Sequence, residues 1–145
     1  MKVVVDTNIV FSAILNSNSN IGNILLNSSN KIEFYSVNFL KSEINKHIDK
    51  ISKITKRNFE EINEITVMIY PFITFISEEL IPKQYLKQAD KLTKDIDFDD
   101  VLFIALSLYF ECPVWTGDKA LINKLNKKGF NNFVNIQMLN EYLIS

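Results

Sequence analysis

The sequence is poor in the residues that build disulfide frameworks, zinc sites and flexible linkers. It has one cysteine, Cys112, which excludes an internal disulfide and a cysteine-based zinc site. It also has only three glycines and three prolines, which leaves no long flexible linker. With 47% hydrophobic residues in a chain of 145, this composition predicts one compact domain over residues 1–145.

Long apolar runs and an excess of charge of one sign are missing as well. The apolar segments are too short, or too often interrupted by charge, to span a bilayer, and "MKVVVDTN" is no signal peptide, so we expect a soluble, cytoplasmic protein without a membrane partner. The formal net charge is −1, and the chain has a single arginine, Arg57. A dedicated nucleic-acid coat protein is therefore excluded, and any polyanion has to be met by a local patch.

Short β-branched or aromatic runs alternate with longer helical patterns, which is typical of βαβ units around a parallel sheet. The strands are predicted at Val3–Val5, Ile32–Tyr35, Phe72–Ile76, Pro113–Thr116 and Phe133–Ile136. The helices are predicted at Thr7–Leu15, Ile21–Leu26, Asn38–Lys50, Thr55–Tyr70, Leu80–Leu92, Asp97–Phe110, Asp118–Lys127 and Gln137–Leu143, with Thr55 as an N-cap.

Two acids directly follow predicted strands. Asp6 comes after Val3–Val5, and Asp118 comes after "VWTG". Ligands bind at the carboxyl edge of such sheets because loops and helix N-termini converge there. Each Asp is also suited to a simple N-cap of the next helix, and for Asp6 the two interpretations have about equal weight.

A third acid, Glu43, lies on the flank of an apolar stripe on the helix from Asn38, where it could point toward Asp6. A solvated Glu43 paired with Lys46 is the simpler interpretation when nothing else is considered. His47, the only histidine, falls within the same stripe and is interpreted as a packed or boundary residue. Neither a Ser-His-Asp triad nor a histidine-rich metal site is indicated.

Carboxylates gathered at one edge are the ligands that a hard divalent cation, Mg²⁺ or Mn²⁺, prefers. Like charges drawn together raise one another's pKa, so a cluster of this kind is costly without a cation. The usual chemistry of such a site is phosphoryl transfer.

The ordered segments "VVVDTNIVFSAIL", "FLKSEI" and "DFDDVLFIALSLYFECPVWTGDKALINKL" resemble the PIN domain family, a metal-dependent nuclease fold that includes VapC-like toxins of toxin-antitoxin modules. The resemblance covers essentially the whole chain. It implies a three-layer α/β/α sandwich with a parallel sheet of about five strands. It also implies an endoribonuclease that hydrolyses phosphodiester bonds in single-stranded RNA by in-line attack of water.

Residue by residue, the resemblance makes Asp6, Glu43, Asp100 and Asp118 the catalytic and metal-binding acids, with Mg²⁺ or Mn²⁺ as cofactor. The auxiliary positions that it implies are Asn8, Asp97 and Thr116. Within "DIDFDD", Asp97 and Asp100 share a helix face. We expect Asp97 to be the N-cap or an outer acid and Asp100 the ligand, whereas Asp95 and Asp99 belong to a solvated turn.

The sequence says less about the RNA and protein partners of this chain than about its fold. Most lysines are expected to be ordinary surface residues, with Lys119, next to the proposed site, as the candidate RNA contact. The resemblance suggests a cognate antitoxin and a homodimer. Two other functions stay open, a non-catalytic PIN-like RNA-binding module and a haloacid-dehalogenase-like phosphatase. The phosphatase family uses "DxD", and this sequence has Asn8 at the second position.

Overall fold

A computed structural model describes residues 1–28 and 30–145, with the backbone alone for residue 98. Within these residues, five parallel strands form one sheet in the order β3-β2-β1-β4-β5. The strands are β1 (Lys2–Val5), β2 (Glu33–Val37), β3 (Ile73–Ile76), β4 (Val114–Trp115) and β5 (Phe133–Val134). The predicted parallel sheet is therefore confirmed, and each strand lies where the β-branched and aromatic runs indicated.

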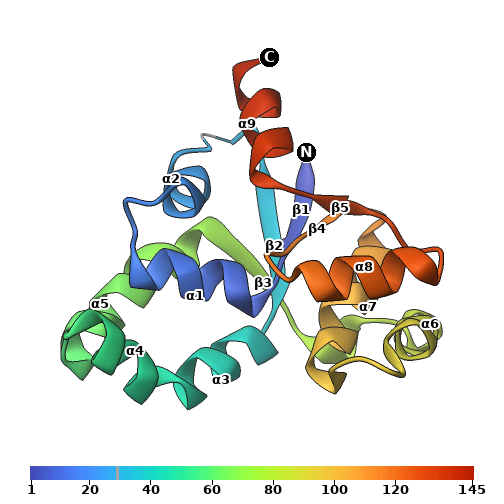
Figure 1. The fold of residues 1–145 in the computed structure, drawn as a ribbon, viewed down its shortest axis with the longest axis horizontal. Helices are drawn as coiled ribbons and strands as arrows, with labels where there is room; N and C mark the ends of the chain where they lie inside the picture. The colour runs from blue at the N-terminus through green and yellow to red at the C-terminus, as the bar shows by residue number, and fades with distance from the viewer. Residues whose placement is uncertain (29) are drawn as a thin grey trace.

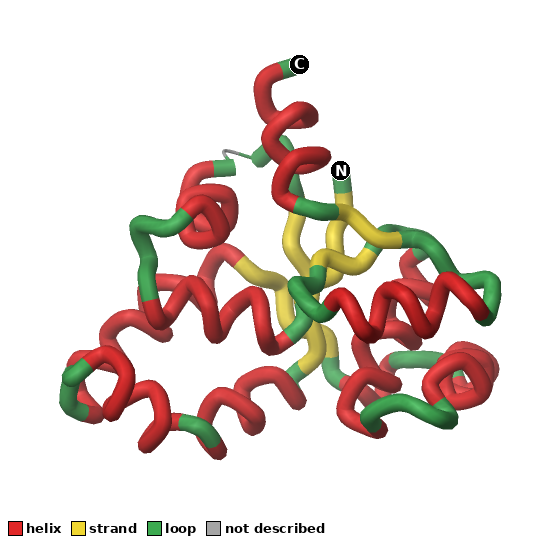
Figure 2. The backbone as a smooth tube through the Cα atoms, in the orientation of Figure 1, coloured by secondary structure: helices red, strands yellow, loops and turns green. Residues whose placement is uncertain are grey.

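Helices cover both faces of this sheet, as Figures 1 and 2 show. On one side lie α1 (Thr7–Leu15), α2 (Asn20–Asn27), α3 (Phe39–Lys46), α4 (Ile48–Thr55) and α5 (Phe59–Ile69). On the other lie α6 (Lys83–Thr93), α7 (Val101–Phe110) and α8 (Lys119–Lys127). The last helix, α9 (Ile136–Ile144), packs against α2. Three short 3₁₀ helices, η1 (Tyr70–Phe72), η2 (Glu78–Leu80) and η3 (Phe98–Asp100), complete the described elements. This is the predicted three-layer α/β/α arrangement.

The centre of the sheet explains where a site can form. In β1 the side chains of Val3, Val4 and Val5 are fully buried, because this strand is covered on both faces. The chain builds β2 and β3 on one side of β1 and then returns to build β4 and β5 on the other. The strand order thus reverses between β1 and β4, and in open α/β sheets a crevice opens at such a point beyond the carboxyl ends of the strands.

Several helix boundaries differ from the sequence prediction, among them the starts of α6 at Lys83 and of α7 at Val101. The expected helix Asn38–Lys50 is two helices, α3 and α4, with His47 between them. His47 is exposed, so its assignment to the buried stripe was wrong. His47 ends α3 and precedes α4, so the regular helical spacing of the stripe is interrupted at this residue.

The N-cap of α5 also differs. Thr55 is the last residue of α4, which ends because Lys56 adopts a left-handed conformation with φ 55°. Asn58 is the N-cap instead: its Oδ1 accepts a hydrogen bond from the Glu61 amide at 2.9 Å, and Glu61 Oε1 accepts one from the Asn58 amide at 3.3 Å. The predicted Thr55 cap was therefore wrong, and a reciprocal capping box three residues later starts the helix.

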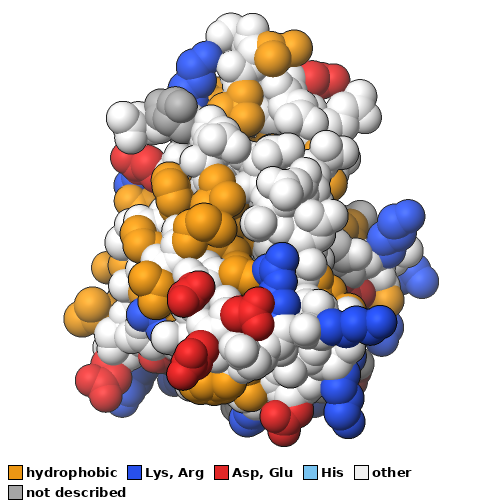
Figure 3. Space-filling view, turned by 90° about the vertical axis from the view of Figure 1, so that its left-hand side faces the viewer, with side chains coloured by type: hydrophobic (Ala, Val, Ile, Leu, Met, Phe, Trp, Pro, Cys, Tyr) orange, Lys and Arg blue, Asp and Glu red, His pale blue; other side chains and the backbone are white. Residues whose placement is uncertain are grey.

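The side of the molecule that carries α4 and α5 is shown in space-filling form in Figure 3, where hydrophobic side chains gather near acidic ones. Exposed apolar side chains on these two helices are Ile54, Phe59, Val67 and Met68. None of the described helices has the length and apolar character needed to cross a membrane.

Candidate acidic active site

Six carboxylates line one pocket of about 270 Å³ at the carboxyl end of the sheet. They are Asp6, Glu43, Asp97, Asp99, Asp100 and Asp118. The structure thus brings together the four acids that the sequence singled out, and Asn8 and Asp97 line the same pocket. A larger hollow of about 590 Å³ lies beside α2 and β2, but Glu33 is the sole acid among the described residues that line it. The cluster of acids therefore lies in the smaller pocket.

Asp6 is the most buried of these acids, with 4% of its surface exposed. One of its oxygens accepts a hydrogen bond from the Ile9 amide at 3.1 Å, so Asp6 is the N-cap of α1. Its carboxylate also accepts hydrogen bonds from the Thr116 hydroxyl and the Asn8 amide. Burial nevertheless raises the pKa of Asp6 from 3.8 to about 6, since desolvation outweighs these hydrogen bonds.

Thr116 connects Asp6 to Asp118. The Thr116 hydroxyl donates to the Asp6 carboxylate and accepts a hydrogen bond from the Asp118 amide at 3.1 Å. Asp118 in turn accepts from the Leu121 amide at 3.1 Å as the N-cap of α8. Both interpretations of Asp6 and Asp118 therefore apply at once: each caps a helix, and each faces the pocket. The positive helix N-termini favour carboxylates in these positions.

Glu43 reaches the pocket from α3 and is half-buried. Its Oε1 accepts a hydrogen bond from the Thr7 hydroxyl at the start of α1. Burial raises the pKa of Glu43, the charges of Asp99 and Asp97 raise it further, and the Thr7 hydrogen bond and the charge of Lys46 oppose this. Glu43 is therefore a half-buried acid of this pocket, and the charge of Lys46, which the simpler interpretation invoked, is the smallest of these influences on its pKa.

The run "DIDFDD" leads into the pocket through η3. Asp97 Oδ1 accepts from the Asp99 amide at 3.1 Å, and the Asp97 carbonyl accepts from the Asp100 amide at 3.0 Å. These two hydrogen bonds close the turn of η3. The residue at the N-cap of α7 is Asp100, whose side chain makes no cap hydrogen bond, so the prediction of Asp97 as the N-cap of this helix was wrong. Asp99 lines the pocket, so its assignment to a solvated turn was wrong. The 3₁₀ geometry of η3, with about three residues per turn, differs from the α-helical spacing used in the prediction.

Asp100 has the most strongly raised pKa of the described pocket acids, about 7. Desolvation is the largest cause, followed by the charges of Asp6, Asp97, Asp118 and Glu43. The carboxylates therefore interact electrostatically as one group.

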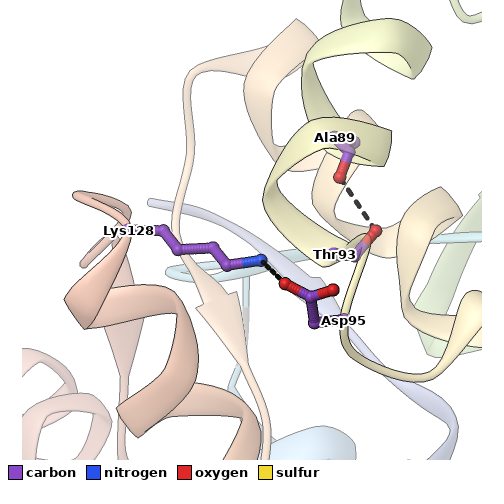
Figure 4. A network of polar contacts seen from close by, with 4 residues as sticks. All are labelled: Ala89, Thr93, Asp95 and Lys128. Atoms are coloured by element: carbon purple, nitrogen blue, oxygen red, sulfur yellow. Dashed lines mark hydrogen bonds and ion pairs between the residues drawn. The ribbon is translucent and has the colours of Figure 1, made fainter.

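Asp95, the first acid of the run, is not among the described residues that line the pocket. It pairs with Lys128 at 3.5 Å, while Thr93 donates to the Ala89 carbonyl at 2.9 Å and closes α6 (Figure 4). The Asp95 side chain is 82% exposed, so solvent screens the pair and it contributes little to stability. Asp95 is a solvated residue, as predicted.

The donor set fits a hard divalent cation, because it consists of clustered carboxylate oxygens whose mutual repulsion a cation would relieve. Among the described residues, no three His, Cys, Asp or Glu side chains are already arranged to hold an ion. Binding would thus require the carboxylates to rotate toward one another. The residues that could hold the ion are Asp6, Glu43, Asp100 and Asp118.

Besides Asp99, several residues of the pocket were not singled out as site residues from sequence. Thr7 binds Glu43, and Phe11, His47 and Lys50 line the wall formed by α1, the α3–α4 junction and α4. The Thr in "DTN" was a usable signal, since a hydroxyl next to a site acid is a natural partner for another carboxylate. By contrast, Lys119 is exposed and absent from the described lining of the pocket.

Comparisons with known proteins agree with the fold. The family model for the PIN domain matches residues 4–132. The chain belongs to the PIN domain family. This PIN domain has the same fold as a chain in the crystal structure of VapBC2 from Rickettsia felis bound to a DNA fragment from their promoter. The TM-score is 0.65 at 15% identity, and the match covers 93% of this chain and 97% of that chain. A search of curated proteins found no match.

Proposed function

We propose that this PIN domain is a divalent-metal-dependent endoribonuclease that hydrolyses phosphodiester bonds in single-stranded RNA in the cytoplasm. The observation that carries the proposal is the gathering of Asp6, Glu43, Asp100 and Asp118 in one pocket at the point where the strand order reverses. Membership of the PIN domain family, whose members are generally nucleases, supports it.

Each acid has a distinct task in this proposal. Asp6, Asp100 and Asp118 would hold a Mg²⁺ or Mn²⁺ ion, with Glu43 as the fourth acid. A bound ion would neutralise charge on the phosphate and lower the pKa of a water molecule. Thr116 orients Asp6 and the loop that carries Asp118, and Thr7 orients Glu43.

The test is cleavage of single-stranded RNA by the purified protein. We expect cleavage with Mg²⁺ or Mn²⁺, none with EDTA, and a loss of about 100-fold or more in Asp6→Asn and Asp100→Asn, the scale of removing a group that acts in the chemical step. Asp95→Asn is the matched control, because Asp95 belongs to the same acidic run but is exposed and lies outside the pocket lining. Cleavage that survives EDTA and both site substitutions would refute the proposal.

We further propose that the protein is the toxin of a toxin-antitoxin module and that a cognate antitoxin binds it. The likeness to a chain of VapBC2 supports this role, although at 15% identity the likeness establishes the fold alone. The exposed apolar side chains of α4 and α5 are suited to a protein partner, either the antitoxin or a second copy in a homodimer. Co-expression with the product of the neighbouring gene, followed by copurification, tests the antitoxin.

The two other functions make different predictions. A non-catalytic RNA-binding module would bind single-stranded RNA tightly and cleave none under any divalent metal. A haloacid-dehalogenase-like phosphatase would need an acid at residue 8, and this chain has Asn8 there. Both the fold and the family match favour the nuclease.

A further inference from the structure

The charges around the acidic pocket are distributed unevenly. Against six carboxylates, the described lining contains a single lysine, Lys50, and a single histidine, His47. Both come from one wall, the junction of α3 and α4 and the first turn of α4. A polyanion that approaches this pocket is repelled on most sides, and the Lys50 wall is the side on which it is attracted.

The ammonium group of Lys50 is available to a ligand. Within the described part of the chain it makes no ion pair, although carboxylates line the same pocket. Instead its Nζ lies over the ring of Phe11, 5.8 Å from the ring centroid. Phe11 is half-buried and packs against the core, so its ring is fixed in position. Cation–π contacts are weak at exposed positions such as Lys50, and this one places the ammonium at the pocket wall without neutralising it.

We propose, on the basis of the nuclease function proposed above, that Lys50 held over Phe11 binds an RNA backbone phosphate next to the one at the acids. Lysine binds phosphate as a point charge without requiring the fork of an arginine, which suits a chain with one arginine. Lys50 therefore sets the side from which the strand enters, along the wall of α1 and α4. In this inference Lys50, and not Lys119, is the principal phosphate contact of the pocket.

The experiment compares Lys50→Ala with Lys53→Ala. Lys53 is an exposed lysine one turn further along α4 and lies outside the described pocket lining, so it controls for loss of charge. Binding of a short fluorescein-labelled single-stranded RNA is measured by anisotropy over a range of salt concentrations, with Asp100→Asn in every variant to prevent cleavage. Cleavage kinetics are then measured with Asp100 intact.

We expect Lys50→Ala to weaken RNA binding about tenfold and to reduce the slope of log affinity against log salt by about 0.7, the value for one lost phosphate contact on a single strand. In cleavage, KM should rise while kcat stays within about twofold. Lys50→Arg should bind nearly as well as the parent protein, and Lys53→Ala should leave affinity, slope and KM unchanged.

The outcomes separate this inference from the function on which it rests. Equal affinities and slopes for Lys50→Ala and Lys53→Ala, with RNA cleavage intact, would overturn the role of Lys50 alone. Binding that depends on Lys50 without any cleavage in Mg²⁺ or Mn²⁺ would support Lys50 and overturn the nuclease. Absence of both RNA binding and cleavage in the parent protein would overturn both.

Discussion

At the scale of single residues, two threonines organise the acids. Thr116 contacts Asp6 and the Asp118 amide, while Thr7 contacts Glu43 from the start of α1. Hydroxyl partners of this kind limit the rotation of a carboxylate and keep it ionised by donating to its charged form. They also join segments that are distant in sequence, since Thr7 and Glu43 lie in different helices.

Thr7→Val tests this positioning role. The substitution keeps the branched shape of the side chain and removes the donor to Glu43, so the pKa of Glu43 should rise further and its orientation should loosen. We expect metal-dependent RNA cleavage to fall about tenfold, with a higher Mg²⁺ concentration needed for half-maximal rate. Thr7→Ser, which keeps the hydroxyl, should restore most of the rate. An unchanged Mg²⁺ dependence in Thr7→Val would show that this hydrogen bond does not position Glu43.

At the scale of elements, helix N-termini serve two purposes. The N-caps of α1 and α8 are site acids, Asp6 and Asp118, whereas the N-cap of α5 is Asn58 within a capping box. The α5 cap is separate from the pocket, because none of its residues belongs to the pocket lining. At α1 and α8, the residue that caps the helix is therefore also a candidate site acid. At α5, the residue that caps the helix has no part in the pocket.

The capping box can therefore be tested by stability alone. Asn58→Ala removes the acceptor for the Glu61 amide and should lower the free energy of unfolding by about 1 kcal/mol, as measured by urea denaturation. Asn63→Ala, at an exposed position inside the same helix, should leave stability unchanged or raise it slightly, because alanine is a better helix former. Equal stabilities of the two variants would contradict the capping role of Asn58.

At the scale of the whole molecule, the acidic pocket makes stability depend on pH and on cations. Asp6 has a folded-state pKa of about 6 and Asp100 one of about 7, both above the ordinary value of 3.8. The folded state therefore binds protons more tightly than the unfolded chain. The resulting stability is complete below about pH 4 and is lost as pH rises through 6 and 7. For Asp6 the difference corresponds to about 3 kcal/mol.

We accordingly expect the melting temperature of the metal-free protein in EDTA to fall between about pH 5 and pH 8, with a smaller fall in Asp100→Asn, whose amide carries no charge. Mg²⁺ or Mn²⁺ should raise the melting temperature at about pH 8 and have little effect at about pH 5, where protons occupy the same oxygens. Thermal unfolding followed by circular dichroism measures both. Identical pH profiles for the parent protein and Asp100→Asn would mean that ionisation of Asp100 does not contribute to the pH dependence of the melting temperature.

The sequence by itself determined the order of strands and helices and the caps Asp6 and Asp118, because these features depend on side-chain period and on contacts within a few residues. The set of four candidate acids came from the resemblance to the PIN domain family. Local patterns did not identify the break at His47, the start of α5 at Asn58 or the place of Asp99. Those depend on where α3, α4 and η3 turn to pack against the sheet. Lys50 lines the pocket, whereas Lys53, the other lysine of α4, is not among the described lining residues.

The tertiary structure decided which distant acids lie together. Four acids that are far apart in the chain lie in one pocket: Asp6, Glu43, Asp100 and Asp118. The reversal of strand order between β1 and β4 brings them together. Burial there changes their pKa values, which no local pattern predicts, because desolvation depends on the whole fold. The sequence supplied the carboxylates, and the closing of the fold around β1 made them one electrostatic group.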